Sequence, residues 1–519
     1  MQKSIRQSMA SLHSWTGLLL GWLLFAIFLM GSTAYYRHNL NLWMQPALAQ
    51  IQVNQETALN TAYQYLQNEA SDAKTWYLEI ATQEKPFNKM YWQKQDGSYG
   101  SALLNPATGQ ELKLSGTQGG EFFYLFHFQL FGIPVLIGRL IACFAALIML
   151  IALISGIITH KKILADFFTF RTFKGQRSWL DFHNICSVIA LPFFLTITFT
   201  GLAILFYLYL PWSLEKFYPE NKYQYFEEIN QKILTKEDHP KPAAMLPIQQ
   251  VLAISQQQWG ITDYARLEVK NPNTTSAKIT LVQSTDYSIT RDASQLTVNG
   301  ISGQIITDTK NRSAIATLNS GVYGLHMATF AQPLLRFALF FSGILGCLMI
   351  ASGLLLWSLK RHLQNKTQAF HLGFYLVDRL NVATFIGLPT AMLCYLYANR
   401  LLVSVQPGGT NYEIYSFFIS WLILFTLAIM TKKQWLWKIQ LAIFICLAFS
   451  LPIYDLYYLS QQNYISGLSH YWNFLRIDLM LWLFAFLAFF IYRNIEPIQL
   501  KSSQKLSAKI IRNTQEVNS

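Results

Sequence analysis

Four histidines stand beside long apolar segments, and their side chains are the ones in this chain best suited to ligand chemistry. His13 opens the stretch HSWTGLLLGW, and His183 opens HNICSVIALP. His127 and His326 each precede a further apolar run. Neutral imidazole is a common ligand of haem iron, zinc and copper. The recurrence of these histidines at comparable places predicts a ligand site within a membrane protein.

The composition indicates the membrane. Of the 519 residues 52% are hydrophobic and only 13% are charged, whereas soluble domains carry about 25% charged residues. The net charge of +13 comes largely from basic residues that flank apolar runs, which indicates membrane topology rather than nucleic-acid binding. The five cysteines form no C-x-x-C pair, so neither an iron–sulfur cluster nor a disulfide framework is predicted. We expect a lipid bilayer as the surroundings and no nucleic acid as a partner.

A membrane-spanning helix needs about 20 mostly apolar residues. We predict a polytopic α-helical membrane protein with about eight such helices, the first of them retained rather than cleaved as a signal peptide. They lie near Trp15–Tyr36, Pro134–Thr159, Asn184–Leu210, Leu334–Ser358, Val382–Ala398, Ile414–Met430, Leu436–Ile453 and Ile477–Tyr492.

Basic residues give these spans an orientation. They cluster before the first span and after the second, fourth, sixth and eighth, which all face one side if the spans alternate. The positive-inside rule makes that side cytoplasmic. The clusters are Lys3 and Arg6; His160, Lys161, Lys162, Arg171, Lys174 and Arg177; Lys360, Arg361 and Lys366; Lys432 and Lys433; and Lys501, Lys505 and Lys509. Both termini are then cytoplasmic.

Two long segments, 37–133 and 211–333, face the opposite side. Each begins with apolar residues at helical spacing, over Thr57–Ala70 and Ile248–Trp259. Each continues with alternating stretches typical of strands, TWYLEIA and KMYWQK in the first and ARLEVK and AKITLVQ in the second. Each ends in a glycine-containing turn, NPATGQEL or NGISGQIIT. We predict two small α+β domains.

The chain contains an internal repeat. HSWTGLLLGWLLFAIFLMGSTAYY aligns with HNICSVIALPFFLTITFTGLAILF, and EFFYLFHFQLFGIPVLIGRL aligns with GVYGLHMATFAQPLLRF. His127 therefore pairs with His326, and Arg139 with Arg336. Each unit consists of a span, an outer domain and a second span, so we predict parallel repeats related by a pseudo-twofold axis along the membrane normal. Their four spans form a bundle, and bundle cores hold cofactors between facing side chains.

This symmetry predicts two pairs of facing imidazoles. His13 and His183 lie at the cytoplasmic end, and His127 and His326 at the outer end. Haem iron takes two axial imidazoles, and its macrocycle is an apolar disc that suits an apolar core. Two stacked haems would give electrons a path across the bilayer. Arg139 and Arg336 are candidate partners of haem propionates, with snorkelling to the interface as the alternative.

Neighbouring residues leave alternatives open. Gly17 and Gly21 follow His13 at intervals of four, which leaves room for a flat macrocycle but equally permits close helix packing. Zinc or copper is an alternative to haem, although no carboxylate or thiolate companion is evident. A lone interfacial histidine is often only a polar anchor. His160 lies on the same side as His13 and is an alternative inner ligand. Ordinary surface or loop roles are expected for His38, His239, His362, His371 and His470.

The stretches LHSWTGLLLGWLLFAIFLMGSTAYY and DFHNICSVIALPFFLTITFTGL resemble the first and third helices of PepSY-associated transmembrane proteins. The resemblance extends from residue 1 to about residue 362, and the outer segments resemble PepSY domains. It implies a bacterial inner-membrane location with two periplasmic domains. The resulting arrangement is span 1–36, periplasmic domain 37–133, span and basic loop 134–182, span 183–210, periplasmic domain 211–333, span and loop 334–381, four-span region 382–492 and cytoplasmic tail 493–519.

The family includes ferric-siderophore reductases that bind haem. The resemblance therefore implies an oxidoreductase that holds haem b, two copies in all, through His13, His183, His127 and His326. Electrons would pass from a cytoplasmic or quinol donor to a periplasmic ferric siderophore or other ferric chelate. No G-x-G-x-x-G motif follows a predicted strand, so the donor is a separate molecule.

Two other functions remain open at the level of sequence. PepSY-like domains could bind peptides or regulate a peptidase without catalysis, and the last four spans could form a permease for a chelate or solute. Five charged residues near the outer ends of those spans are candidates for a substrate vestibule or for ordinary interfacial anchors. They are Arg400, Glu413, Asp455, Arg476 and Asp478.

Overall fold

The computed structural model describes residues 4–114, 116–160, 167–168, 171, 176–221, 224–230, 241–260, 263–284, 288–290, 294–309, 314–364, 370–402, 410–464 and 471–495. The chain divides into two compact units. The first comprises Met1–Met44, Ser115–Leu202 and Phe337–Ser519, and the second comprises Gln45–Leu114 and Ala203–Arg336. Several residues named above lie outside the described part of the chain: Lys3, Lys161, Lys162, Lys174, His239, Lys366, His470, Lys501, Lys505 and Lys509.

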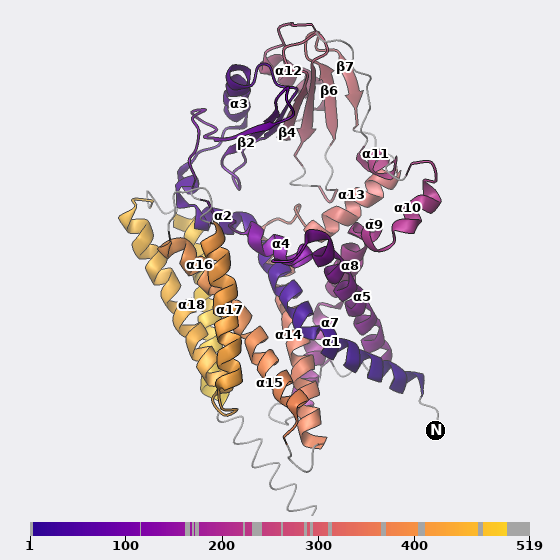
Figure 1. Ribbon diagram of the computed structural model, residues 1–519, viewed down its shortest axis with the longest axis vertical. Coiled ribbons are helices and arrows are strands. Elements are labelled where there is room, and N and C mark those ends of the chain that lie inside the picture. Colours follow the sequence, from indigo (N-terminus) through magenta and orange to yellow (C-terminus); the bar gives the residue numbers. More distant parts are fainter. Residues whose placement is uncertain are drawn as a thin grey trace, which may run out of the picture. The chain divides into compact units, whose positions relative to one another are not determined.

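The first unit is helical, and its long helices confirm a multi-pass membrane protein (Figure 1). Within the described residues, seven helices are long and apolar enough to span a membrane, and a bent pair makes a possible eighth. The spans are α1 (Ile5–Ala34), α5 (Val135–Thr159), the pair α7 (Gln176–Ile189) and α8 (Leu191–Ile204), α14 (Pro333–Gln364), α15 (Leu372–Phe385) with α16 (Gly387–Leu401), α17 (Thr410–Met430), α18 (Leu436–Gln461) and a last helix at Tyr471–Ile495.

Local chemistry moves some boundaries away from their predicted places. α1 starts ten residues before Trp15, because Ser4 and Gln7 form a capping box at its N-terminus: Gln7 N donates to Ser4 Oγ at 3.3 Å and Ser4 N donates to Gln7 Oε1 at 2.9 Å. The third span is not a single straight helix. It bends by 64° between α7 and α8, where Pro192 removes one backbone donor. His183 therefore lies in the middle of α7 rather than at the start of a span.

Four spans of the repeat pack together. α1 contacts α5 along its length and contacts α14 through Gly21, which faces Leu354, and Ser32, which faces Gly343. Phe28 of α1 packs edge-on against Phe194 of α8 at 6.0 Å between ring centroids. The small residues let the helix backbones approach closely, as is usual for helix pairs in membranes.

Two short helices stand before spans two and four instead of continuing into them. They are α4 (Glu121–Gln129) in the first unit and α13 (Ala314–Met327) in the second. Each is followed by a non-glycine residue with positive φ, Leu130 at 56° and Ala328 at 50°. Since left-handed backbone ends a helix, His127 and His326 lie on separate elements and not at the ends of the spans themselves.

The second unit holds one antiparallel sheet of seven strands in the order β3-β2-β1-β4-β5-β6-β7. The strands are β1 (Thr75–Glu79), β2 (Asn88–Gln93), β3 (Tyr99–Leu104), β4 (Tyr264–Lys270), β5 (Lys278–Gln283), β6 (Gln295–Asn299) and β7 (Ile305–Asp308). The four predicted strand stretches are thus confirmed. The prediction of two separate small domains is not met, because β1 of the first segment pairs with β4 of the second and joins them in one sheet.

The other elements of this unit are helical. α3 (Gln55–Glu69) and α12 (Ile248–Trp259) match the two predicted helices and pack side by side on one face of the sheet. Leu78, Leu267 and Leu281 are fully buried beneath them. The first segment contributes three strands and one helix and the second contributes four strands and one helix; either alone would leave an apolar face exposed, and joining the halves buries it. The remaining short helices are η1 (Pro46–Gln50), α9 (Phe206–Tyr209), α10 (Pro211–Phe217) and α11 (Gln224–Asn230).

The two halves of the sheet meet where β1 pairs with β4. Leu78 pairs with Leu267 at the centre, while Tyr77 pairs with Glu268 and Glu79 with Arg266. A turn of the same type follows β3 and β6. The Asn105 side chain accepts from Ala107 N at 2.9 Å, and the Asn299 side chain accepts from Ile301 N at 2.9 Å.

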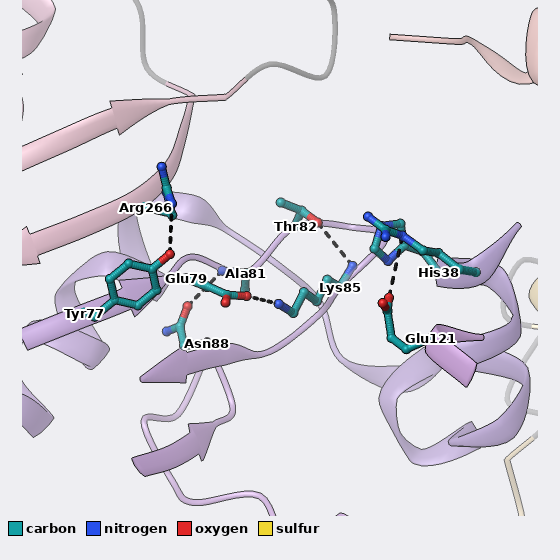
Figure 2. A network of polar contacts seen from close by, with 10 residues as sticks. His38, Tyr77, Glu79, Ala81, Thr82, Lys85, Asn88, Glu121 and Arg266 are labelled. Carbon is teal, nitrogen blue, oxygen red and sulfur yellow. Dashed lines mark hydrogen bonds and ion pairs between the residues drawn. The ribbon is translucent and has the colours of Figure 1, made fainter. Parts of the chain in front are cut away.

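Polar contacts hold the central strands and the loop after β1 (Figure 2). Arg266 donates to the Tyr77 hydroxyl at 3.0 Å, and Lys85 pairs with Glu79. The Asn88 side chain accepts from Ala81 N at 2.9 Å. These contacts fix the loop that connects β1 to β2.

Candidate functional site

Two of the four predicted ligands meet inside the first unit. The rings of His13 on α1 and His183 on α7 lie with their centroids 6.2 Å apart and their planes at 66°. The residues are 170 positions apart in the sequence, and the packing of α1, α5, α7 and α14 brings them together. The two imidazoles predicted to form the inner pair therefore lie next to each other in the structure.

Each of these rings makes the same contact through Nδ1. His13 Nδ1 lies 2.8 Å from Ala152 O of α5, and His183 Nδ1 lies 2.9 Å from Met349 O of α14. His183 Nδ1 also lies 3.2 Å from Ser352 Oγ. A carbonyl oxygen can only accept, so Nδ1 carries the proton in both rings. The Nε2 lone pair of each is left for a ligand, as in metal-binding histidines oriented by a backbone carbonyl.

His127 repeats this arrangement at another level of the bundle. Its Nδ1 lies 2.8 Å from Ile27 O of α1. Burial lowers the pKa of His127 below its usual value, and the hydrogen bond to Ile27 opposes the shift without cancelling it. The contact with the Ile27 carbonyl therefore gives His127 the same tautomer as His13 and His183, with the proton on Nδ1.

A glycine four residues after the accepting carbonyl accompanies each of the three histidines. The pairs are Ala152 and Gly156, Met349 and Gly353, and Ile27 and Gly31. A Cβ on Gly156 or Gly353 would lie 3.2 Å from Cε1 of the facing histidine, and a Cβ on Gly31 would lie 2.6 Å from His127 Nδ1. The glycines thus let the imidazoles approach the helix backbone. This spacing of carbonyl and glycine is visible in the sequence and marks where each imidazole contacts a neighbouring helix.

His326 lies near the end of α13, in the second unit, whereas His127 belongs to the first. Because the two residues belong to different units, the pairing of His127 with His326 stays a prediction. The arginines that follow them lie in the first turns of α5 and α14. Arg139 donates to the Gln129 side chain at 3.3 Å, and Arg336 forms a 2.7 Å ion pair with Glu84. Their role toward a propionate also stays a prediction.

His160, the alternative inner ligand, ends α5. Its Nε2 lies 2.9 Å from the amide nitrogen of Asn184, one residue after His183. An amide nitrogen can only donate, so this Nε2 accepts and is engaged by a protein group. Among the described residues no group bonds Nε2 of His13 or of His183 in this way, so these two histidines are the better candidates for the inner site.

The remaining described histidines have local partners. His362 contacts Asp378 at 3.1 Å, His371 stacks on Phe374 at 4.2 Å between centroids, and His38 accepts from Arg37 at 3.4 Å. These contacts agree with ordinary interfacial or loop roles.

The room beside His13 and the number of protein ligands available both limit which metal or cofactor His13 and His183 can bind. One turn after His13, a Cβ on Gly17 would find no atom of the described residues within 4 Å. Nowhere in the described ranges do three His, Cys, Asp or Glu side chains gather as metal ligands. Zinc sites use three or four protein ligands, whereas haem iron needs only two axial ones from the protein. The residues present thus fit the axial positions of a haem better than a zinc site.

A second polar cluster lies in the C-terminal spans, and the sequence does not predict its burial. Arg400, Asp455 and Asp478 are 2%, 0% and 2% exposed, so they are not solvent-facing interfacial anchors. Glu413 joins them through the Asn399 side chain and is 5% exposed. No motif marks these residues in the sequence. The available signal was their position, since all lie toward the same ends of successive spans.

A family model for the PepSY-associated transmembrane region matches residues 10–360. The chain belongs to this family. The match contains all four predicted ligand histidines and ends just before α15, so the cluster around Arg400 lies beyond it. No curated protein matches the chain. The matched region therefore comprises the first four spans and the sheet, and the C-terminal spans lie beyond it.

Proposed function

We propose that this protein binds haem between His13 and His183 and carries electrons across a membrane to ferric iron in a chelate such as a siderophore. The observation that supports this most strongly is the facing pair of rings, each with Nδ1 on a backbone carbonyl. A metal bonds each imidazole at about 2 Å, which places two axial rings with centres roughly 6 Å apart. The 6.2 Å between the His13 and His183 centroids agrees with that spacing.

In this proposal the haem supplies a one-electron couple on its iron. The protein contributes the ligands and their orientation. His13 and His183 offer Nε2, and the carbonyls of Ala152 and Met349 hold each ring in the required tautomer and raise its basicity. The apolar spans keep water from the site, which stabilises the less charged form of the cofactor. Gly17 leaves space beside the pair for a flat macrocycle.

We further propose that the region is a tandem repeat with a pseudo-twofold axis. Three correspondences support it. His13 and His183 make equivalent contacts to Ala152 and Met349, the sheet pairs Leu78 with Leu267 at its centre, and a positive φ follows each of the helices α4 and α13. On this symmetry His127 and His326 would hold a second haem, and Arg139 and Arg336 would lie near it.

The orientation follows from charge. With the basic loops inside, the protein would lie in a bacterial inner membrane with both termini in the cytoplasm and the sheet in the periplasm. An electron from a cytoplasmic or quinol donor would enter near His13 and His183 and leave toward the sheet. Transfer of one electron converts Fe(III) in the chelate to Fe(II), which hard oxygen ligands hold less tightly.

An anaerobic reduction assay tests the proposal. The full-length protein, produced with ample haem and reduced with dithionite, should show a b-type haem spectrum that reoxidises when a ferric siderophore is added. The His13→Ala and His183→Ala variants should each lose the part of this signal that comes from the haem between these two residues, and His371→Ala should keep the whole signal. A colourless protein would contradict the haem proposal, and reduced haem that ignores every ferric chelate would contradict the substrate. Peptide binding, or solute uptake into liposomes without a donor, would instead support the two alternative functions.

A further inference from the structure

The cluster in the C-terminal spans is a closed network of buried polar groups. Arg400 of α16 donates to Asp455 Oδ1 of α18 at 2.5 Å, to Asn399 Oδ1 at 2.9 Å and to the backbone oxygen of Trp43 in α2 (Arg37–Met44). Its guanidinium carbon lies 3.8 Å from the centroid of the Trp43 ring. Every nitrogen of this guanidinium is thus engaged, and Asp455 is the carboxylate that balances its charge.

Asp478, on the last helix, is the additional acid. Its Oδ1 accepts from Trp43 Nε1 at 3.2 Å, and its carboxyl group interacts directly with that of Asp455. Oδ2 of Asp455 and Oδ2 of Asp478 are both buried, and neither has a hydrogen-bond donor in the described part of the chain. Two ionised carboxylates in contact repel each other strongly, so such pairs share a proton.

The surroundings decide where that proton resides. Arg400 bonds Asp455 and not Asp478, so Asp455 is the ionised member and Asp478 the protonated one. The protonated Oδ2 of Asp478 can then donate to Oδ2 of Asp455, which satisfies both unpartnered oxygens. Other titratable groups lie beside the cluster: Tyr458 of α18, Tyr471 of the last helix, and Glu413 of α17, which accepts hydrogen bonds from Asn399 and Thr117.

We propose that Asp478 is a proton-binding site within the C-terminal spans, with Asp455 and Arg400 as the ion pair that holds the bound proton in a hydrogen bond. The cluster lies at the ends of the helices opposite Lys432 and Lys433, so the proton exchanges with water on that side. Binding leaves the cluster neutral, and release leaves one negative charge. Ionisable groups inside membrane spans commonly mark proton or ion pathways. The inference does not depend on haem binding.

Infrared spectroscopy of the full-length protein in lipid vesicles tests this directly. The wild type should show a carbonyl band of a protonated carboxylic acid at pH 7, where exposed carboxylates are ionised. The band should shift in heavy water and disappear at alkaline pH. Asp478→Asn should remove it, whereas Asp96→Asn, an exposed acid on the sheet unit, should leave it unchanged.

Three results would overturn the proposal. They are the absence of the band in the wild type at pH 7, a band that does not respond to heavy water or alkaline pH, and a band that survives in folded Asp478→Asn. Since the first two are measured on the wild type, the test stands even if a variant fails to fold.

Discussion

Buried polar side chains are satisfied differently in two regions of the molecule. One region is the helices around His13 and His183, and the other is the helices around Arg400. Both bury polar groups where the bilayer offers no water, so each group needs a partner inside the protein. In the histidine bundle each ring satisfies Nδ1 on a carbonyl and keeps Nε2 for something else. Around Arg400 the groups satisfy one another, provided that one acid carries a proton. The histidine pair can therefore still bind a ligand through Nε2, whereas the groups around Arg400 can bind only a proton.

The difference has a consequence for stability. Removing a histidine from the open site leaves a carbonyl that is already bonded within its helix, so little is lost from the fold. Removing Arg400 or Asp455 from the closed cluster leaves the other member's charge buried without its partner, and such changes are strongly destabilising. Substitutions in the two regions should therefore separate stability from ligand binding.

The largest effect is expected at the ion pair. Asp455→Asn should lower the free energy of unfolding by about 3–5 kcal/mol, because Arg400 remains buried without a carboxylate. Asp478→Asn, on the other side of the same network, should change it by less than about 1 kcal/mol, since a neutral group replaces a neutral one. Thermal unfolding in detergent, followed by tryptophan fluorescence, compares the two. Equal losses in both variants would show that both aspartates are ionised.

A smaller loss of stability is expected when the glycine that contacts His127 is replaced by alanine. Gly31→Ala should destabilise the fold by about 1–3 kcal/mol and displace His127, because the new Cβ would lie 2.6 Å from its Nδ1. Gly17→Ala is the matched control in the same helix, where the Cβ meets open space. Helix propensity alone would make that control neutral or slightly stabilising in protein without cofactor. The same unfolding measurement applies, and identical curves for the two variants would refute the described position of His127.

Gly17→Ala also tests whether a haem occupies the space beside His13. A macrocycle in the space beside His13 would meet the added methyl group, so haem affinity should fall while the stability of the cofactor-free protein stays unchanged. Titration of haem into the cofactor-free protein measures this affinity. Unchanged affinity would mean that the cofactor does not use this space.

The smallest loss of stability is expected when Ser352 or Ser155, which lie beside the carbonyls that hold His183 and His13, is replaced by alanine. Ser352→Ala removes a group that contacts both His183 Nδ1 and the Met349 carbonyl, and should cost about 0.5–1.5 kcal/mol. Ser155→Ala removes only a 3.1 Å bond to the Ala152 carbonyl and should cost less. Chemical denaturation of the two variants without cofactor provides the comparison. A greater loss at Ser155 would contradict the description of the two histidine environments.

Much of the architecture was predictable because it depends on local pattern. Each predicted span corresponds to an observed long helix or bent pair, and Ile248–Trp259 matches α12 at both ends. The pairing of His13 with His183 followed from the repeat alone. The bend at Pro192 and the breaks at Leu130 and Ala328 were missed, since hydropathy averages over many residues and does not register a single backbone angle.

Long-range pairing and burial were harder to anticipate. The register of β1 against β4 depends on two segments almost 200 residues apart, so the single sheet could not be read from either segment. Arg400, Asp455 and Asp478 resembled interfacial anchors because sequence position gives depth along a helix but not the direction of a side chain. Only packing shows that they face one another.

The central claim is that His13 and His183 are the two axial ligands of one haem. Absorbance and electron paramagnetic resonance spectra of the full-length protein, produced with ample haem, test it most directly. We expect a low-spin bis-imidazole signal in the wild type, and loss of one such haem per protein in His13→Ala and in His183→Ala, but not in His160→Ala. The same haem content and spectrum in all four proteins would contradict the claim.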